Sequence, residues 1–172
     1  VLYQLGALAG FAHAAGAQLR HVKAHGALYN TAVREPAQAA SVARAIAAFD
    51  PGLIVVTLPG SALAQAAKSL NLAVAYEGFA DRAYEDDGTL ASRNRPGAVL
   101  HDPSAICERA VRMAVRGEVM AVSGKVIRLR IDTICIHGDT PGAAEIAATL
   151  RQALEEAGIQ IVPLTPKQLR AT

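Results

Sequence analysis

Three polar stretches of this sequence contain most of the side chains that could carry out chemistry, and each stretch follows a short apolar strand. They cover residues 21–30, 77–84 and 134–141. The carboxyl ends of parallel strands meet at one edge of a sheet, which is where α/β enzymes hold their active sites. We therefore expect the three stretches to converge there and to present imidazole, ammonium and carboxyl groups to one small molecule.

The first stretch offers an imidazole and an ammonium group. His25 follows a strand end and precedes a glycine, whose lack of a side chain would let a ligand approach the backbone. It is a candidate general acid/base, and the alternative is a histidine that only satisfies loop carbonyls. Lys23 could hold a substrate carboxylate or pair with Glu77, and both alternatives bury it in the interior. Tyr29 and Asn30 could bind the substrate through hydrogen bonds.

The second stretch contains the densest charged group at any strand end. A carboxylate of Glu77 or Asp81 beside a cation could act as a base or orient His25, and Arg82 could bind a carboxylate through two parallel hydrogen bonds. The alternative is a salt-bridged network that only fixes the following loop. Tyr84 could bind the substrate or anchor that loop.

The third stretch carries His137 and Asp139, separated by one glycine. Both could join a proton relay or bind a metal, but for Asp139 the stronger interpretation is a cap on the helix expected to start near Pro141. The residue types would suit a metal, yet no HExxH or CxxC spacing occurs, so a metal is not assigned. His13 and His101 are expected at the surface.

Apolar runs with strand or helix spacing alternate along the chain. This order is typical of a parallel α/β fold, either an open doubly wound sheet or a sector of a barrel, and the spacing alone does not choose. A polar loop over 78–100 is long enough to serve as a lid, and a β-hairpin near 118–131 is an insertion. The expected helices cover residues 1–16, 36–49, 61–70, 103–116 and 140–157, and the expected strands cover 19–23, 53–57, 73–77, 133–137 and 160–162.

Composition favours one globular domain. The 172 residues are 52% apolar and 19% charged with a net charge of +2, so no strong field would attract nucleic acid or a membrane surface. Neither GxGxxG nor GxxxxGK[ST] occurs, which argues against a nucleotide site in this chain. The chain opens at Val1 inside a helix-like stretch, without an initiator Met or a preceding strand, and we expect it to be the back part of a longer protein.

Two smaller features have simple interpretations. Cys107 and Cys135 are expected to be reduced, buried thiols, since they lack CxxC spacing. Arg109, Arg112 and Arg116 have helical spacing and are expected to form a solvated helix face, with a protein-binding surface as the alternative.

The sequence resembles the LamB/YcsF family in four ordered motifs. The one visible departure is Ala24, where the family usually has Pro, and this would loosen the turn before His25. The resemblance covers essentially the whole chain. Its motifs are Val-Lys-Ala-His-Gly-Ala-Leu-Tyr-Asn at 22–30, Leu-Pro-Gly-Ser at 58–61, Glu-Gly-Phe-Ala-Asp-Arg-Ala-Tyr at 77–84 with Gly-Thr-Leu at 88–90 and Ser-Arg at 92–93, and Ile-Cys-Ile-His-Gly-Asp at 134–139.

This resemblance implies a fold and an origin for the fragment. Family members are similar to irregular (β/α) TIM-like barrels of the glycoside hydrolase/deacetylase type, and they begin with an acidic strand motif and a Gly-Phe-His motif. Neither motif occurs here. We therefore expect residues 1–172 to form one incomplete barrel domain that lacks the first strands.

The resemblance also implies an activity, because family members are the A subunit of bacterial 5-oxoprolinase. The implied reaction is ATP-dependent hydrolysis of the lactam of 5-oxo-L-proline to L-glutamate, in the cytoplasm, by a complex with 5-oxoprolinase subunits B and C. ATP would be bound mainly by those partners, which could phosphorylate the lactam oxygen before water attacks in this barrel. A homodimer is a further assembly to consider.

The predicted site residues follow from the two lines of reasoning together. The expected catalytic residues are His25, Glu77, Asp81 and His137, and the expected substrate-binding residues are Lys23, Tyr29, Asn30, Arg82 and Tyr84. Two rival functions stay open, a metal-dependent deacetylase of an N-acetyl sugar and a scaffold protein without catalysis.

Overall fold

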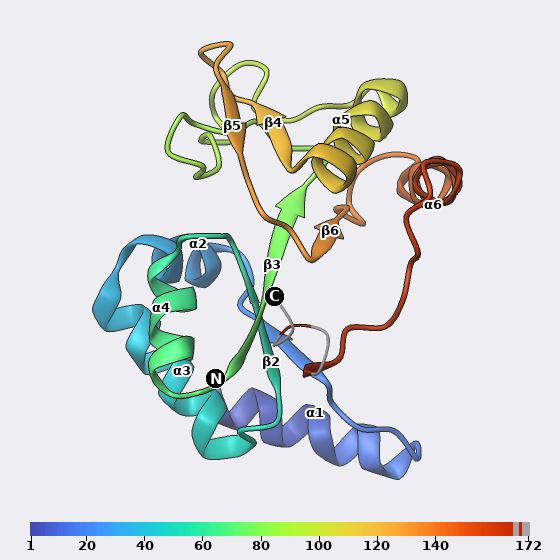
Figure 1. Cartoon of the computed structure of the whole chain (residues 1–172). Helices are drawn as coiled ribbons and strands as arrows, with labels where there is room; N and C mark the ends of the chain where they lie inside the picture. Colours follow the sequence, from blue (N-terminus) through green and yellow to red (C-terminus); the bar gives the residue numbers. More distant parts are fainter. Residues whose placement is uncertain (167–168, 170–172) are drawn as a thin grey trace. The chain divides into compact units, whose positions relative to one another are not determined.

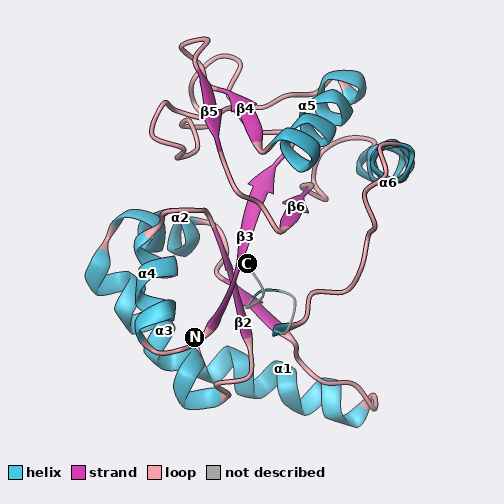
Figure 2. Cartoon of the chain, viewed as in Figure 1, coloured by secondary structure: helices cyan, strands magenta, loops and turns pink. Residues whose placement is uncertain are grey.

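The computed structural model describes residues 1–166 and 169, which form two compact units (Figures 1 and 2). The first unit contains residues 1–76 and the C-terminal segment from Leu164, and the second contains residues 77–163. Each unit is described by itself. The single barrel domain expected for residues 1–172 stays a prediction. No helix among the described residues is long and apolar enough to cross a membrane.

The first unit alternates strands and helices, as expected. β1 (His21–Lys23) pairs in parallel with β2 (Ile54–Thr57), and β2 pairs in parallel with residues 73–76 of β3 (Ala73–Phe79). The helices are α1 (Leu2–Ala14), α2 (Ala27–Arg34), α3 (Pro36–Phe49) and α4 (Ala62–Ser69). The predicted helices and strands of this unit are confirmed, but α2 was missed because it begins inside the first polar stretch and its N-cap, Gly26, makes no side-chain cap.

Local sequence explains where these elements begin. Pro36 opens α3, since a proline lacks only an amide hydrogen that the first helical turn does not use. Ser61 caps α4 by accepting a hydrogen bond from the Ala64 amide at 3.1 Å, and its hydroxyl also lies 3.1 Å from that of Thr57. All four residues of β2 are buried, as expected for a strand covered on both faces.

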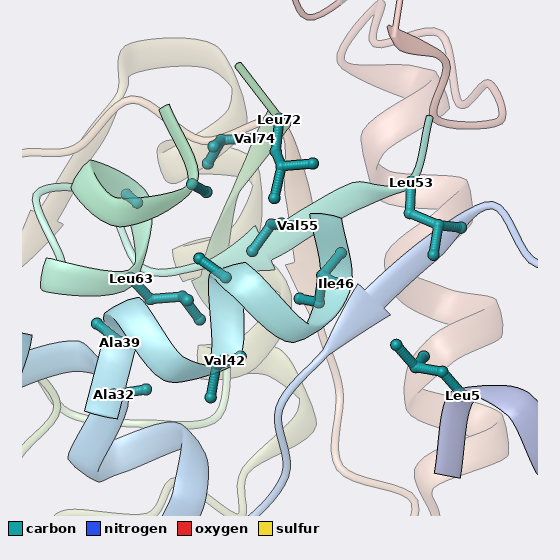
Figure 3. Packing of buried hydrophobic residues seen from close by; sticks show 13 residues of the cluster. Leu5, Ala32, Ala39, Val42, Ile46, Leu53, Val55, Leu63, Leu72 and Val74 are labelled. Carbon is teal, nitrogen blue, oxygen red and sulfur yellow. The ribbon is translucent and has the colours of Figure 1, made fainter. Parts of the chain in front are cut away.

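The core of the first unit is aliphatic (Figure 3). Ile46 of α3 is 1% exposed and packs among leucine, valine and alanine side chains from the neighbouring helices and strands. The buried members of this cluster are Leu5, Ala32, Ala39, Val42, Ala43, Ile46, Leu53, Val55, Leu63, Ala64, Ala67, Leu72 and Val74.

The second unit is built on the end of β3. Residues 77–79 pair in parallel with β6 (Thr133–Cys135), and β4 (Glu118–Met120) pairs antiparallel with β5 (Val126–Arg128). The helices are α5 (Pro103–Arg116) and α6 (Ala143–Glu156), which pack on each other through a second apolar cluster. The predicted hairpin and both helices are confirmed. Cys107 is buried on α5, whereas Cys135 is only half-buried, and neither forms a disulfide bond in the described part of the chain.

One glycine in this unit marks a close approach between layers. A Cβ atom added at Gly78 on β3 would lie 2.6 Å from the Met113 Cε of α5 and 3.1 Å from the Ile131 Cγ2. These distances are shorter than ordinary van der Waals contact, so a side chain at position 78 would fit only if the flexible end of Met113 moved aside.

The loop expected over 78–100 is folded onto itself rather than open. Two isolated antiparallel bridges join Arg82 to Val99 and Tyr84 to Leu90. Backbone hydrogen bonds run from the Leu100 amide to the Asp81 carbonyl at 2.8 Å and from the Ala83 amide to the Ala98 carbonyl at 2.9 Å. The segment is therefore a small, internally bonded layer.

Two predictions about secondary structure and exposure in the second unit were wrong. Residues 160–162 form no strand, because a run this short needs a pairing partner and Ile161 and Val162 are exposed instead. Arg109 and Arg112 do not lie on a solvated face: both are half-buried, and they donate to the Arg82 carbonyl and to Glu118 Oε2 respectively.

The predicted cap on α6 was also wrong. The N-cap residue is Gly142, and no side chain caps this helix. Asp139 lies three residues earlier, is exposed, and therefore does not reach the first turn.

Candidate active site

A buried carboxylate and an imidazole meet in the second unit. Asp81 Oδ2 lies 2.6 Å from His137 Nδ1, and the two side chains are 1% and 20% exposed. The imidazole also stacks on the ring of Phe79, with centroids 5.6 Å apart and planes inclined by 22°. Both the hydrogen bond and the stacking fix the plane of the imidazole.

This arrangement suits a general base. When Nδ1–H donates to the carboxylate, Nε2 keeps its lone pair and can accept a proton from water or a substrate. The neighbouring carboxylate then stabilises the imidazolium that forms, as in catalytic triads. The second oxygen of Asp81, Oδ1, is buried and accepts no hydrogen bond from the described residues.

The segment that carries Asp81 is held by neighbours on both sides. The Tyr84 hydroxyl accepts a hydrogen bond from the Phe79 amide at 2.7 Å, and burial raises the pKa of Tyr84, which keeps the phenol neutral. Arg109 of α5 donates to the Arg82 carbonyl, and the Leu100 amide donates to the Asp81 carbonyl. The carboxylate is therefore presented by a rigid support.

Arg82 serves the same support. Its guanidinium donates to the Ala91 carbonyl at 2.7 Å and to the Ala98 carbonyl at 3.4 Å. Burial lowers the pKa of Arg82, and the nearby positive charge of Arg93 lowers it further. These contacts favour the loop-fixing alternative for Arg82 over the predicted two-pronged grip on a substrate carboxylate.

The pair opens onto a polar pocket of about 360 Å³. Three arginines, two histidines and two aspartates are among the side chains that surround it. Its lining residues are Asp81, Arg82, Arg93, Arg95, Gly97, Val99, His101, His137, Asp139, Thr140 and Pro141. The pocket therefore combines a candidate base with an excess of fixed positive charge.

The structure thus brings the second and third polar stretches together. Asp81, Arg82, His137 and Asp139 share the pocket, whereas Glu77 is buried on β3 and does not line it. Tyr84 is fully buried and its hydroxyl accepts the hydrogen bond from the Phe79 amide, which favours the anchoring alternative, and its contact with substrate stays a prediction.

The first stretch belongs to the other unit, and its convergence with the pocket stays a prediction. His25 and Asn30 are exposed, and Tyr29 is buried on α2. Lys23 lies with its ammonium 5.7 Å from the centre of the Tyr29 ring and is exposed, so the expected interior position was wrong. The reason is that β1 pairs only with β2 among the described strands.

Sequence reasoning missed Arg93, Arg95 and Thr140 as pocket residues. The sequence signal was the Ser-Arg motif at 92–93, which is followed closely by a second arginine, Arg95, and a Pro-Gly turn. His101, expected at the surface, is exposed and lines the same pocket. Among the described residues, no group of three His, Cys, Asp or Glu side chains could hold a metal ion.

Comparison with known proteins identifies the family. The model of the LamB/YcsF family matches residues 1–169. The chain belongs to the LamB/YcsF family. A relative from Bradyrhizobium diazoefficiens, named as a 5-oxoprolinase A subunit, is 57% identical over 95% of this chain and 64% of its own length. The 5-oxoprolinase A subunit of Nitrobacter hamburgensis is 54% identical over the same shares.

A solved structure of similar sequence supports the fold. The lactam utilization protein from Thermus thermophilus aligns with a TM-score of 0.88 and 45% identity, covering 95% of this chain and 65% of that protein. This similarity confirms the predicted α/β class and is consistent with a TIM-like barrel. The chain spans just under two thirds of the length of these family members.

Proposed function

We propose that this chain is part of the A subunit of a 5-oxoprolinase and that the Asp81–His137 pair activates water for opening the lactam of 5-oxo-L-proline. The observation that carries this proposal is the 2.6 Å contact between a buried carboxylate and a half-buried imidazole beside an arginine-lined pocket. Relatives named as A subunits of 5-oxoprolinase, more than half identical to this chain, give the substrate.

The proposed step uses groups of this chain for proton transfer. His137 Nε2 accepts a proton from water, and the water oxygen bonds to the lactam carbonyl carbon. The carbon–nitrogen bond of the ring then breaks with its electron pair on nitrogen, and the imidazolium returns the proton to that nitrogen. The net change adds one water to 5-oxoproline and yields glutamate.

ATP and the partner proteins complete the proposal. A five-membered lactam is a stable amide, so the reaction is coupled to hydrolysis of ATP to ADP and phosphate. We assign ATP binding mainly to 5-oxoprolinase subunits B and C, which would phosphorylate the lactam oxygen before water attacks. Cleavage of the ring C–N bond then leaves an acyl phosphate, and a second water hydrolyses it to glutamate and inorganic phosphate. We assign the reaction to the cytoplasm.

Turnover in the reconstituted complex tests the role of the pair. The full-length protein would be combined with its two partner subunits, and glutamate formation from 5-oxo-L-proline would be measured with and without ATP. His137→Ala should lower kcat by at least about a hundredfold, the range typical of a general base. His13→Ala, an exposed histidine of α1, is the matched control and should leave kcat unchanged.

The same assay separates the rival functions. Unchanged turnover by the His137→Ala complex, with assembly intact on size-exclusion chromatography, would favour a scaffold role for this chain. Release of acetate from N-acetyl sugars by the full-length protein alone, together with a metal found by elemental analysis, would favour the deacetylase instead.

A further inference from the structure

The loop over residues 92–97 has a defined shape. The Arg95 amide donates to the Ser92 carbonyl at 3.0 Å, and the Ala98 amide donates to the Arg95 carbonyl at 3.1 Å. These are two consecutive β-turns, and the second requires Gly97, whose φ of +75° suits a residue without a side chain. The turns present Arg93 and Arg95 from fixed backbone positions.

The loop is tied to the segment that carries Asp81. Arg82 donates to the carbonyls of Ala91 and Ala98, the residues on either side of the loop. The Ala83 amide also donates to the Ala98 carbonyl, and the Ala91 amide donates to the Ala83 carbonyl. Because both ends of the loop are bound to residues next to Asp81, its two arginines are held in register with the Asp81–His137 pair.

Not every guanidinium group at the pocket has a carboxylate partner among the residues that the structure describes. Asp81 is engaged by His137, and Arg95 is paired with Glu85 at 3.2 Å with both side chains largely in solvent. Arg93 is exposed, makes no ion pair with the described residues, and lies close enough to Arg82 to depress its pKa. Asp139 is the other carboxylate on the lining. Guanidinium groups that face a hollow in this way attract an anion.

We propose that Arg93 and Arg95 form an oxyanion-binding subsite that holds an anionic group of the substrate beside His137. The ligand assignment rests on the proposed function. Guanidinium groups bind carboxylate and phosphate oxygens through paired hydrogen bonds, so the shared chemistry is an oxyanion. Its source is either the carboxylate of 5-oxo-L-proline or a phosphate group on the activated lactam.

Glu85 competes with this ligand. Its carboxylate holds Arg95 in an exposed ion pair, which contributes little free energy because solvent screens it. An incoming oxyanion competes with Glu85 for Arg95, whose Nη1 donates to both oxygens of the Glu85 carboxylate, and removal of Glu85 makes this nitrogen available in advance. Glu85→Gln should therefore tighten binding by about two- to fivefold, the size of a surface ion pair.

Calorimetric titration of the full-length protein tests the subsite without turnover. The probes are 5-oxo-L-proline and inorganic phosphate, each measured without ATP or partner subunits and at constant ionic strength. Arg93→Gln and Arg95→Gln should each weaken binding of at least one probe by about tenfold or more, as expected for loss of a charge-assisted pair. Arg116→Gln, an exposed arginine of α5 outside the pocket, is the matched control and should bind both probes as the wild type does.

The outcomes separate the subsite from the proposed function. A loss confined to 5-oxo-L-proline identifies the carboxylate as the ligand group, and a loss confined to phosphate identifies the phosphate. Equal binding by the wild type and both arginine variants, or no binding of either probe by the wild type, overturns the subsite. Unchanged turnover by the reconstituted His137→Ala complex, with probe binding that still depends on Arg93 and Arg95, would overturn the proposed function and leave the subsite standing.

Discussion

The two units of this protein bury different kinds of side chain. The first has an aliphatic core around Ile46, and the buried polar groups of its described residues include the neutral hydroxyls of Thr57 and Ser61, which bond to each other. The second buries three charged side chains among the described residues, namely Glu77, Asp81 and Arg82.

This difference indicates that the first unit is stabilised mainly by aliphatic burial, whereas the second holds the charged side chains that could take part in catalysis. Aliphatic burial stabilises a fold by about 25 cal/mol for each Å² removed from water, and it needs no partner of fixed geometry. Buried charges destabilise a fold unless hydrogen bonds hold them, and those bonds also fix their orientation. The second unit therefore has the rigid polar groups that catalysis needs, and changes in the two units should have different readouts.

The largest effect is expected from Asp81→Asn in the second unit. An amide at this position would present its NH2 group or a weaker acceptor to Nδ1, so the imidazole would lose its orientation and the charge that stabilises imidazolium. We expect kcat of the reconstituted complex to fall by about 10²- to 10⁴-fold with a normal circular dichroism spectrum. Asp86→Asn, an exposed aspartate of the same segment, is the control, and a kcat within twofold of wild type for Asp81→Asn would contradict the assigned role.

The next largest effect is expected from Ile46→Ala in the first unit, which should lower stability without acting on the candidate site. Ile46 is 1% exposed, and truncation would leave a cavity that costs about 2–5 kcal/mol of unfolding free energy. Urea denaturation measures this change. Leu8→Ala, on the 57% exposed Leu8 side chain of α1, should cost far less, and equal losses from the two variants would show that the aliphatic cluster is not the stabilising core.

A smaller loss is expected from Tyr84→Phe. The substitution removes the acceptor of the buried Phe79 amide, and an unsatisfied buried donor costs about 1–3 kcal/mol. The same denaturation experiment compares it with Tyr3→Phe, on a tyrosine that is 87% exposed. If Tyr84→Phe lowers substrate affinity with stability unchanged, the anchoring role assigned here is wrong and the sequence-based prediction of substrate binding is right.

The smallest effect is expected from Ser61→Ala. It removes the cap of α4 and the buried contact with Thr57, for a cost of about 1 kcal/mol. Ser41→Ala on the exposed face of α3 is the control, because that hydroxyl donates only to the Ala37 carbonyl of its own helix. If Ser61→Ala shifts the urea midpoint no more than Ser41→Ala does, the Ser61–Thr57 hydroxyl pair does not stabilise the first unit.

The sequence was most informative where one local signal decided the outcome. Pro36, Ser61 and the Asp102-Pro103 pair start the helices that they predicted, because caps and the first helical turn are local interactions. The short run at 160–162 failed because strand formation depends on a neighbouring strand, which local sequence does not contain. α2 was missed for a related reason, since its N-cap is a glycine with positive φ and no side-chain bond.

In the candidate site, too, some contacts could be predicted from the sequence and others could not. His137 and Asp81 are 56 residues apart, yet their convergence was predicted because both follow strands of a parallel sheet, and the structure shows that these strands, β3 and β6, are neighbours. Arg93 and Arg95 could not be predicted in this way, since their positions depend on two turns and on the bonds from Arg82. Arg109 was misjudged because helical spacing gives the face of a residue but not the carbonyl that it meets.

The missing side chain at position 78 has a consequence for how this protein can change. The contact of β3 with Met113 and Ile131 sets how near α5 lies to the strand, and α5 in turn positions the arginine that holds the Arg82 carbonyl. An added methyl group at position 78 would require the end of the Met113 side chain to move, which would disturb the packing of α5 behind the pocket. Substitutions at the pocket rim can change which ligand binds, whereas a substitution at position 78 would act on the packing behind the pocket.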